Sequence, residues 1–139
     1  VAVVTTPGHT SINPKILGTP RGYSHGMLAA KGRLLFVAGQ VGFGTGTELV
    51  SDRFVPQFER ALENVVTVVR EAGGSARDIC RFTIFVIDKR DYTTALAEVG
   101  AAYRRHMGKH FPAMTLVEVA GLIEPGTRVE IEATAVISE

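Results

Sequence analysis

Hydrophobic and polar residues alternate with a period of two near the end of the chain. The odd-numbered positions of residues 128–137 are apolar: Val129, Ile131, Ala133, Ala135 and Ile137. The even-numbered positions begin with the polar residues Arg128, Glu130, Glu132 and Thr134. Because successive side chains of a strand point to opposite faces of a sheet, this pattern predicts a strand with one apolar face and one polar face.

A second stretch, 115–120, is also typical of a strand, and Glu124, Pro125 and Gly126 supply a turn between the two. If the strands lay side by side, Glu118 would join the carboxylates of Glu130 and Glu132 on one face. The alternative is that these carboxylates are simply solvated, since Asp and Glu are mostly exposed.

Two stretches change to a helical period. In the first, the apolar residues are Phe54, Phe58, Ala61, Leu62, Val65, Val68, Val69 and Ala72. This spacing predicts a helix that Ser51 or Asp52 caps and that Gly73 and Gly74 end. The second predicted helix covers 92–107, with Asp91 as its N-cap and Gly108 at its exit.

The remaining apolar runs, 23–30, 33–39 and 79–87, predict three further strands. Lys31 and Gly32 separate the first two runs, which favours a tight hairpin. Residues 1–21 hold three prolines and are expected to be a mostly extended N-terminal segment.

The expected order along the chain is strand, strand, helix, strand, helix, strand, strand. This order predicts a single α+β domain over residues 1–139, with a mixed sheet and two helices on one face. Two helices leave the other face uncovered, and its apolar side chains favour an oligomer that hides them.

The amino-acid composition argues against nucleic-acid binding and against a membrane span. The 139 residues are 45% hydrophobic and 21% charged, with a net charge of +1, so no basic footprint for nucleic acid is expected. No stretch reaches the about 20 apolar residues of a membrane span. The single cysteine, Cys80, fits a small buried residue and a reducing, cytoplasmic location.

Other kinds of chemistry lack their motifs. The glycine-rich stretch 39–46 is not followed by the Lys-Ser or Lys-Thr pair of a phosphate loop. The spacing of His9, His25, His106 and His110 does not match a metal site. We therefore predict neither a metal nor a cofactor.

Six short motifs together carry a family resemblance. They are GYSHG at 22–26, FVAGQ at 36–40, ALENV at 61–65, FPA at 111–113, VEVA at 117–120 and VEIEA at 129–133. On these motifs, from about Gly22 to Val136, the chain resembles the RidA/YjgF family, also called L-PSP endoribonuclease-like.

The resemblance implies a chorismate-mutase-like α+β fold and a homotrimer with small-molecule clefts between neighbouring subunits. It also implies the family's best-known activity, the hydrolysis of reactive imines and enamines to a keto acid and ammonia. The ribonuclease name does not change the expectation that no nucleic acid is bound, because the net charge is near zero.

Several family positions keep their residues. Tyr23 matches the cleft tyrosine, Glu130 matches the glutamate thought to hold the attacking water, and Gly39 and Gln40 are retained. The resemblance thus implies Glu130 and Tyr23 as catalytic candidates, and His25 is a further cleft candidate because its ordinary pKa is near neutral. The alternatives are that Tyr23 is an interface aromatic and that His25 is structural.

Three positions depart from the family pattern. Met114 occupies the place of the arginine that binds the substrate carboxylate, Ala38 replaces a serine, and Leu116 stands where some members have cysteine. A thioether offers neither the charge nor the planar donors of a guanidinium. Arg21, Arg33 and Arg128 are candidates to replace the missing cation, but the sequence does not place them.

Two hypotheses follow. The first is a trimeric imine or enamine hydrolase with an atypical, less anionic substrate and low efficiency on ordinary 2-imino acids. The second is a non-catalytic module on the same scaffold that binds a small molecule or a protein.

Overall fold

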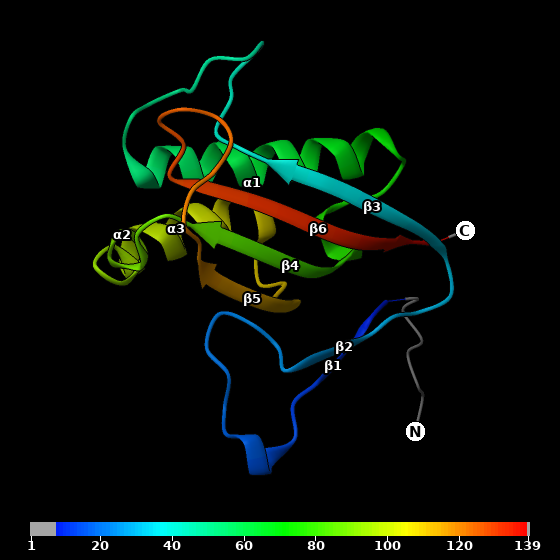
Figure 1. The fold of residues 1–139 in the computed structure, drawn as a ribbon. Helices are drawn as coiled ribbons and strands as arrows, with labels where there is room; N and C mark the ends of the chain where they lie inside the picture. The colour runs from blue at the N-terminus through cyan, green and yellow to red at the C-terminus, as the bar shows by residue number, and fades with distance from the viewer. Residues whose placement is uncertain (1–7, 139) are drawn as a thin grey trace, which may run out of the picture.

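A four-stranded mixed sheet forms the centre of the computed structural model, which describes residues 8–138 (Figure 1). Its strands are β3 (Arg33–Gln40), β6 (Val129–Ile137), β4 (Ile79–Val86) and β5 (Ala113–Glu118), in that spatial order. The β4–β5 pair is parallel and the other two pairs are antiparallel. The helices are α1 (Phe54–Glu71), the short α2 (Lys89–Thr93) and α3 (Leu96–Met107). This arrangement confirms the α+β class.

Both long helices lie on one face of the sheet (Figure 1). The alternation predicted for the last strand is confirmed, because its odd-numbered residues are buried against these helices and its even-numbered ones are not. Phe58 of α1 and Phe82 of β4 are among the largest fully buried side chains of the core. The apolar, odd-numbered residues of β6 therefore lie on the helix-covered face of the sheet.

The first predicted helix is confirmed over Phe54–Glu71, but its cap differs. Arg53 holds the N-cap position, and its amide donates a hydrogen bond to the Ser51 hydroxyl two residues before it, so Ser51 does not cap the helix. The second predicted helix is interrupted. Asp88, rather than Asp91, caps α2, and the helical chain breaks at residues 94–95 before α3 begins.

The predicted hairpin at Lys31 and Gly32 is wrong. β2 (Gly26–Leu28) pairs with β1 (Thr10–Ile12) in a separate two-stranded sheet, and β3 pairs with β6. His9 supplies the physical reason: its Nε2 lies 3.0 Å from the carbonyl oxygens of Asp78 and Val136, and its Nδ1 accepts from the Ala30 amide. These bonds hold β1 and β2 below the sheet (Figure 1).

We call residues 8–30 the N-terminal arm. It holds β1, the 3-10 turn η1 (Lys15–Leu17) and β2, so the segment expected to be extended contains some regular structure in its described part. Residues 1–7 of that segment lie outside the described residues. A second 3-10 turn, η2 (Ala76–Asp78), leads into β4.

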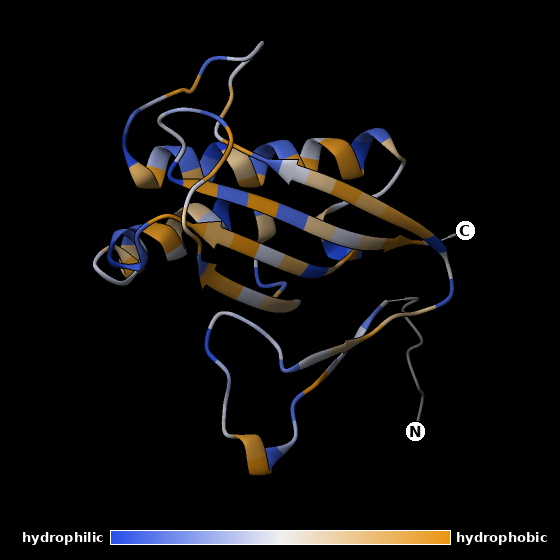
Figure 2. Ribbon diagram, in the orientation of Figure 1, coloured by the Kyte–Doolittle hydropathy of each residue, from blue (hydrophilic) through white to orange (hydrophobic). Residues whose placement is uncertain are grey.

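The face of the sheet opposite the helices, which we call the open face, exposes apolar side chains. Phe36 is 72% exposed and Leu34 is 58% exposed, and both belong to β3. Figure 2 shows the apolar residues along this strand. Among residues 8–138, no helix is both long enough and apolar enough to cross a bilayer.

Candidate functional site

Glu130 lies on the open face beside an irregularity in β3. Val37 pairs with Ala133 and Gln40 pairs with Ile131, so two residues of β3 face one residue of β6. Such a bulge bends the strand and changes where its side chains and amides point. A Cβ at Gly39 would overlap the Glu130 carboxylate, so a larger residue at this position would displace that side chain from its present place.

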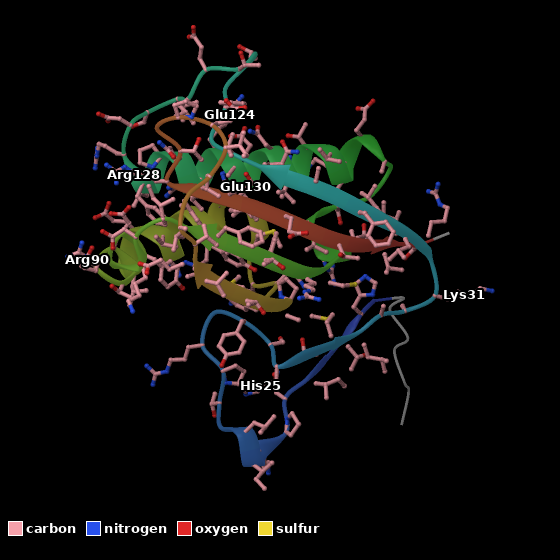
Figure 3. All side chains as sticks on the ribbon, viewed as in Figure 1. His25, Lys31, Arg90, Glu124, Arg128 and Glu130 are labelled. Atoms are coloured by element: carbon pink, nitrogen blue, oxygen red, sulfur yellow. The ribbon has the colours of Figure 1, made fainter. Side chains whose placement is uncertain are left out.

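Four of the predicted site residues therefore gather at this bulge: Ala38, Gly39, Gln40 and Glu130. The Gln40 side chain turns back and donates from Nε2 to the Ala38 carbonyl at 3.3 Å. Glu130 is half-buried, pairs with Phe85 of β4 in register, and is labelled on β6 in Figure 3. We call this group the Glu130 half-site.

Met114 and Leu116 lie on the other face of the sheet. In the parallel β4–β5 pair, Met114 is level with the buried Phe82 and Leu116 is level with the buried Ile84. Both side chains pack against the core under the helices. Within one chain, the predicted position of the family arginine and the predicted water-holding glutamate are thus separated by the sheet itself.

Met114 lines a cavity of about 390 Å³, which we call the Met114 pocket. Its lining residues are Arg21, Gly22, Phe58, Ile84, Tyr92, Leu96, Val99, Gly100, Tyr103, Arg104, Phe111 and Met114. No carboxylate is among them. The walls are therefore apolar, with two arginines as the charged groups.

Tyr23 and His25 lie on the N-terminal arm. Tyr23 lines a different, more polar cavity of about 430 Å³, together with Lys15, Lys109 and other residues. Its ring meets the His25 ring edge-on, with the centroids 5.5 Å apart. His25 Nε2 lies 3.2 Å from the Gly18 carbonyl oxygen, and Figure 3 shows this histidine well away from Glu130.

Ser24 holds the arm against the start of β5. Its amide donates to the Pro112 carbonyl, and its hydroxyl donates to the Phe111 carbonyl. Phe111 lines both the Met114 pocket and the Tyr23 cavity, so these two hollows are neighbours. Of the predicted site residues, Tyr23 thus lies near Met114, while Glu130 does not.

Glu118 does not join the other carboxylates. β4 lies between β5 and β6, and Glu118 is level with the buried Val86. Its Oε1 accepts a hydrogen bond from the Lys89 amide at 3.0 Å, at the start of α2. The expectation that Glu118 shares a face with Glu130 and Glu132 is wrong.

Two groups with raised pKa values stay protonated near neutral pH. Burial raises the pKa of Tyr103, and its hydroxyl donates to the His110 carbonyl oxygen at 2.6 Å. Burial also raises the pKa of the Cys80 thiol, which is the second residue of β4 and is 9% exposed. A thiolate nucleophile at Cys80 is therefore disfavoured.

Of the arginines considered as replacement cations, Arg21 reaches the Met114 pocket. Arg128 instead bonds to Asp91 at 3.2 Å and to the Asp52 carbonyl oxygen at 2.8 Å. Arg33 begins β3, on the far side of the sheet from β5. Sequence reasoning missed Arg104, although the nearby Gly100, a glycine inside a helix, was a detectable signal.

The histidines of the second half of the chain have separate structural partners. His106 Nε2 lies 2.9 Å from Glu59, and His110 Nε2 lies 2.7 Å from the Ile79 carbonyl oxygen. In the described part of the chain, no three His, Cys, Asp or Glu side chains gather as a metal site requires.

Comparison with known proteins identifies the family. The model of the family described as Endoribonuclease L-PSP matches residues 15–137. A RutC family protein of Haemophilus influenzae is 36% identical over 105 residues, which is 76% of this chain and 80% of the relative. A 2-iminobutanoate/2-iminopropanoate deaminase of Salmonella typhimurium has the same identity and the same two coverages.

A solved structure agrees with these relatives. YyfB of Yersinia pestis, described as a protein of unknown function of the conserved Rid family, superposes with a TM-score of 0.84. It is 30% identical, and the match covers 94% of this chain and 99% of that one. The resemblance in fold and sequence is therefore confirmed, and the chain belongs to the RidA/YjgF family.

Proposed function

We propose that this protein is a homotrimer that binds a small molecule in clefts between subunits and hydrolyses an imine or enamine there. The observation that carries the proposal is the separation of the site residues. The Glu130 half-site lies on the open face, and the Met114 pocket lies on the helix-covered face. One chain cannot bring them together, whereas the open face of one copy can meet the pocket edge of another.

The exposed residues of the open face support the assembly. Leu34, Phe36 and Val117 are 58%, 72% and 39% exposed, and they come from the two edge strands of the sheet. In this proposal the assembly covers these exposed apolar side chains, which lie on either side of the polar centre of the face. Closed symmetry would cover the same face in every copy.

The Glu130 half-site suits the chemistry of imine hydrolysis. Water adds to the carbon of the C=N bond, a proton passes to the nitrogen, and the C–N bond then breaks to give a carbonyl and ammonia. A half-buried carboxylate can hold the water and accept its proton. The bulge brings the backbone around Gly39 close to the same carboxylate.

Tyr23 would complete the cleft from the side of the Met114 pocket. It lies on the arm that Ser24 attaches to the start of β5, next to the pocket residue Gly22. A phenol can donate to or accept from the reacting nitrogen. In this proposal His25 orients the Tyr23 ring through their edge-on contact.

Met114 sets the expected selectivity. The thioether packs against the core and offers no charge to a substrate carboxylate placed at β5. We therefore expect weak action on small 2-imino acids, which the named deaminase relative takes as substrates.

A second candidate function is a binding module without turnover. The apolar character of Met114, Leu116 and Ala38 favours it, because these side chains can hold an apolar ligand but cannot move protons. Both candidates share the same cleft and the same assembly.

A coupled assay separates the two candidates. An amino-acid oxidase generates imines from small, aromatic and basic amino acids, and the loss of each imine is followed with and without the protein. We expect acceleration that Glu130→Gln abolishes and that Glu132→Gln retains, since Glu132 is the next residue on the same face of the same strand. No acceleration with any imine would overturn the hydrolase proposal and leave the binding module, for which thermal shift with ligands is the next test.

A further inference from the structure

Two arginines line the Met114 pocket: Arg21, which the sequence offered as a candidate for the missing cation, and Arg104, for which no role was predicted. Arg104 comes from α3 and Arg21 from the N-terminal arm. Residues i and i+4 lie on the same side of a helix, so Arg104 lies one turn after Gly100 on the pocket wall. Arg104 Nη1 is 3.3 Å from the position that a Cβ on Gly100 would occupy. The arginine head therefore lies over the glycine.

Gly100 is an unfavourable residue for its place. Glycine in a helix interior destabilises by about 0.5–1 kcal/mol relative to alanine. Its backbone here is ordinary helix, because its φ is not positive, so no conformational need explains the glycine. What its missing side chain provides is room for the Arg104 head above the pocket.

Neither guanidinium is engaged by another side chain. Among residues 8–138, Arg21 and Arg104 make no side-chain hydrogen bond and no ion pair, and both are exposed. The neighbouring Arg105 differs, because it donates two hydrogen bonds to Glu59, at 2.8 and 2.9 Å. With no carboxylate in its lining, the Met114 pocket has positive charge at its walls and no internal anion to balance it.

We propose that the Met114 pocket binds a carboxylate with a bulky aromatic or branched apolar body. Arg104 holds the carboxylate in a bidentate pair, with Arg21 as the second cation. The body packs on Met114, Leu96 and Phe111 in a cavity of about 390 Å³, which is within the usual size of small-molecule sites. The family's cation is thus moved from β5 to α3, so the ligand keeps its negative charge but needs more bulk.

This inference names the substrate class of the cleft in which we propose hydrolysis. It therefore rests on the proposed function for the reaction, but not for binding. Binding of the anion needs the pocket of one chain. Met114 alone favours a less anionic substrate. The two arginines instead favour an anionic substrate whose carboxylate binds at α3 and not at β5.

Isothermal titration with three probes tests the proposal. They are 3-phenylpropanoate, its neutral amide 3-phenylpropanamide, and propanoate, which has the charge but not the ring. We expect the first to bind at least about tenfold more tightly than either of the others, because charged hydrogen bonds and apolar burial each contribute. Equal binding of the acid and the amide, or no binding of the acid, would overturn the proposal.

Variants assign the effect to Arg104. Arg104→Gln should remove the preference for the acid over the amide, and Arg105→Gln, which changes the adjacent residue paired with Glu59, should keep it. Gly100→Ala should weaken binding of the acid less than Arg104→Gln does, because the new methyl crowds the arginine head without removing its charge, although the helix itself becomes more stable. A preference that survives Arg104→Gln contradicts the assignment.

The two proposals fail in different ways. Tight binding of the acid without imine hydrolysis would contradict the hydrolase and leave this pocket assignment standing. Hydrolysis of imines from aromatic amino acids that Arg104→Gln does not change would contradict the pocket assignment and leave the hydrolase standing.

Discussion

One face of the four-stranded sheet packs against α1 and α3 and holds Met114 in a pocket, whereas the other face carries Glu130 beside Gly39 and exposes Phe36. Both faces are built from the same strands by alternate residues. On the covered face the side chains are held by the core of one chain. On the open face Glu130 lies on the central strand β6, and apolar side chains of the edge strands, such as Phe36, are exposed.

The difference indicates how the two faces divide their roles. The covered face holds the packed core and the Met114 pocket, in which we propose that a ligand binds. The open face supplies the carboxylate and the surface that a second copy would cover. The predictions below test this division, beginning with the largest expected effect.

Phe82 and Phe36 are the same residue type on opposite faces. Phe82→Ala should lower the free energy of unfolding by about 3–5 kcal/mol at every protein concentration, because this fully buried ring leaves a cavity. Phe36→Ala should cost less, and its cost should depend on protein concentration, because assembly would bury this ring. Chemical denaturation at two protein concentrations measures both. If both variants lost the same free energy of unfolding at both protein concentrations, the open face would not be an assembly surface.

Gln57 tests the polar anchor of the covered face. This fully buried side chain donates to the carbonyls of Ser51 and Gly126 and accepts from the Arg128 amide, so it attaches α1 to the chain that leads into β6. Gln57→Leu should lower the free energy of unfolding by about 2–4 kcal/mol, since buried backbone groups lose their partners.

The matched control for this change is Thr67→Ala, on the same helix but exposed. It should alter the free energy of unfolding by less than about 0.5 kcal/mol. If Gln57→Leu were as mild as the control in denaturant unfolding, the three hydrogen bonds would not be the anchor described here.

Glu59 on α1 joins the two long helices by accepting from Arg105 and His106 of α3. The hydrogen bonds from Arg105, opposed by burial and aided by His106, lower the pKa of Glu59 from 4.5 to about 2. Because the folded-state pKa lies below the unfolded one, the carboxylate stabilises the fold above about pH 4.5, and this contribution is lost as the pH falls toward 2.

Glu59→Gln should therefore destabilise the protein near pH 7 and match the parent near pH 2. The difference should not exceed about 1 kcal/mol, because solvent screens a partly exposed pair. Unfolding curves at several pH values measure it, with Glu63→Gln as the control on a longer, 3.8 Å pair. A Glu59→Gln effect that stays constant between pH 7 and pH 2 would be inconsistent with the lowered pKa.

The sequence predicted best the elements whose position depends only on the spacing of nearby apolar residues. The alternation in 128–137 gave β6 and its buried parity, and the helical stripe from Phe54 gave α1. The hairpin at Lys31 failed because its outcome depends on His9, whose ring bonds to carbonyls 69 and 127 residues away. No pattern within a short window contains that information.

The site shows the same limit. The family motifs predict Glu130, Gly39 and Met114 as site positions, and the sequence also predicts which residues of each strand share a face. The placement of Met114 on the opposite face from Glu130 depends on β4 lying between β5 and β6, which is a tertiary fact. Sequence reasoning missed Arg104 because its proposed role depends on the space above Gly100, four residues earlier.

Sedimentation equilibrium of the whole protein tests the central claim most directly, because the proposed site is complete only when the open face of one copy meets the pocket of another. The account predicts a single species with the mass of three chains of 14.9 kDa each. A species with the mass of one chain at micromolar concentration would contradict it, because Glu130 and Met114 would then remain on opposite sides of one sheet.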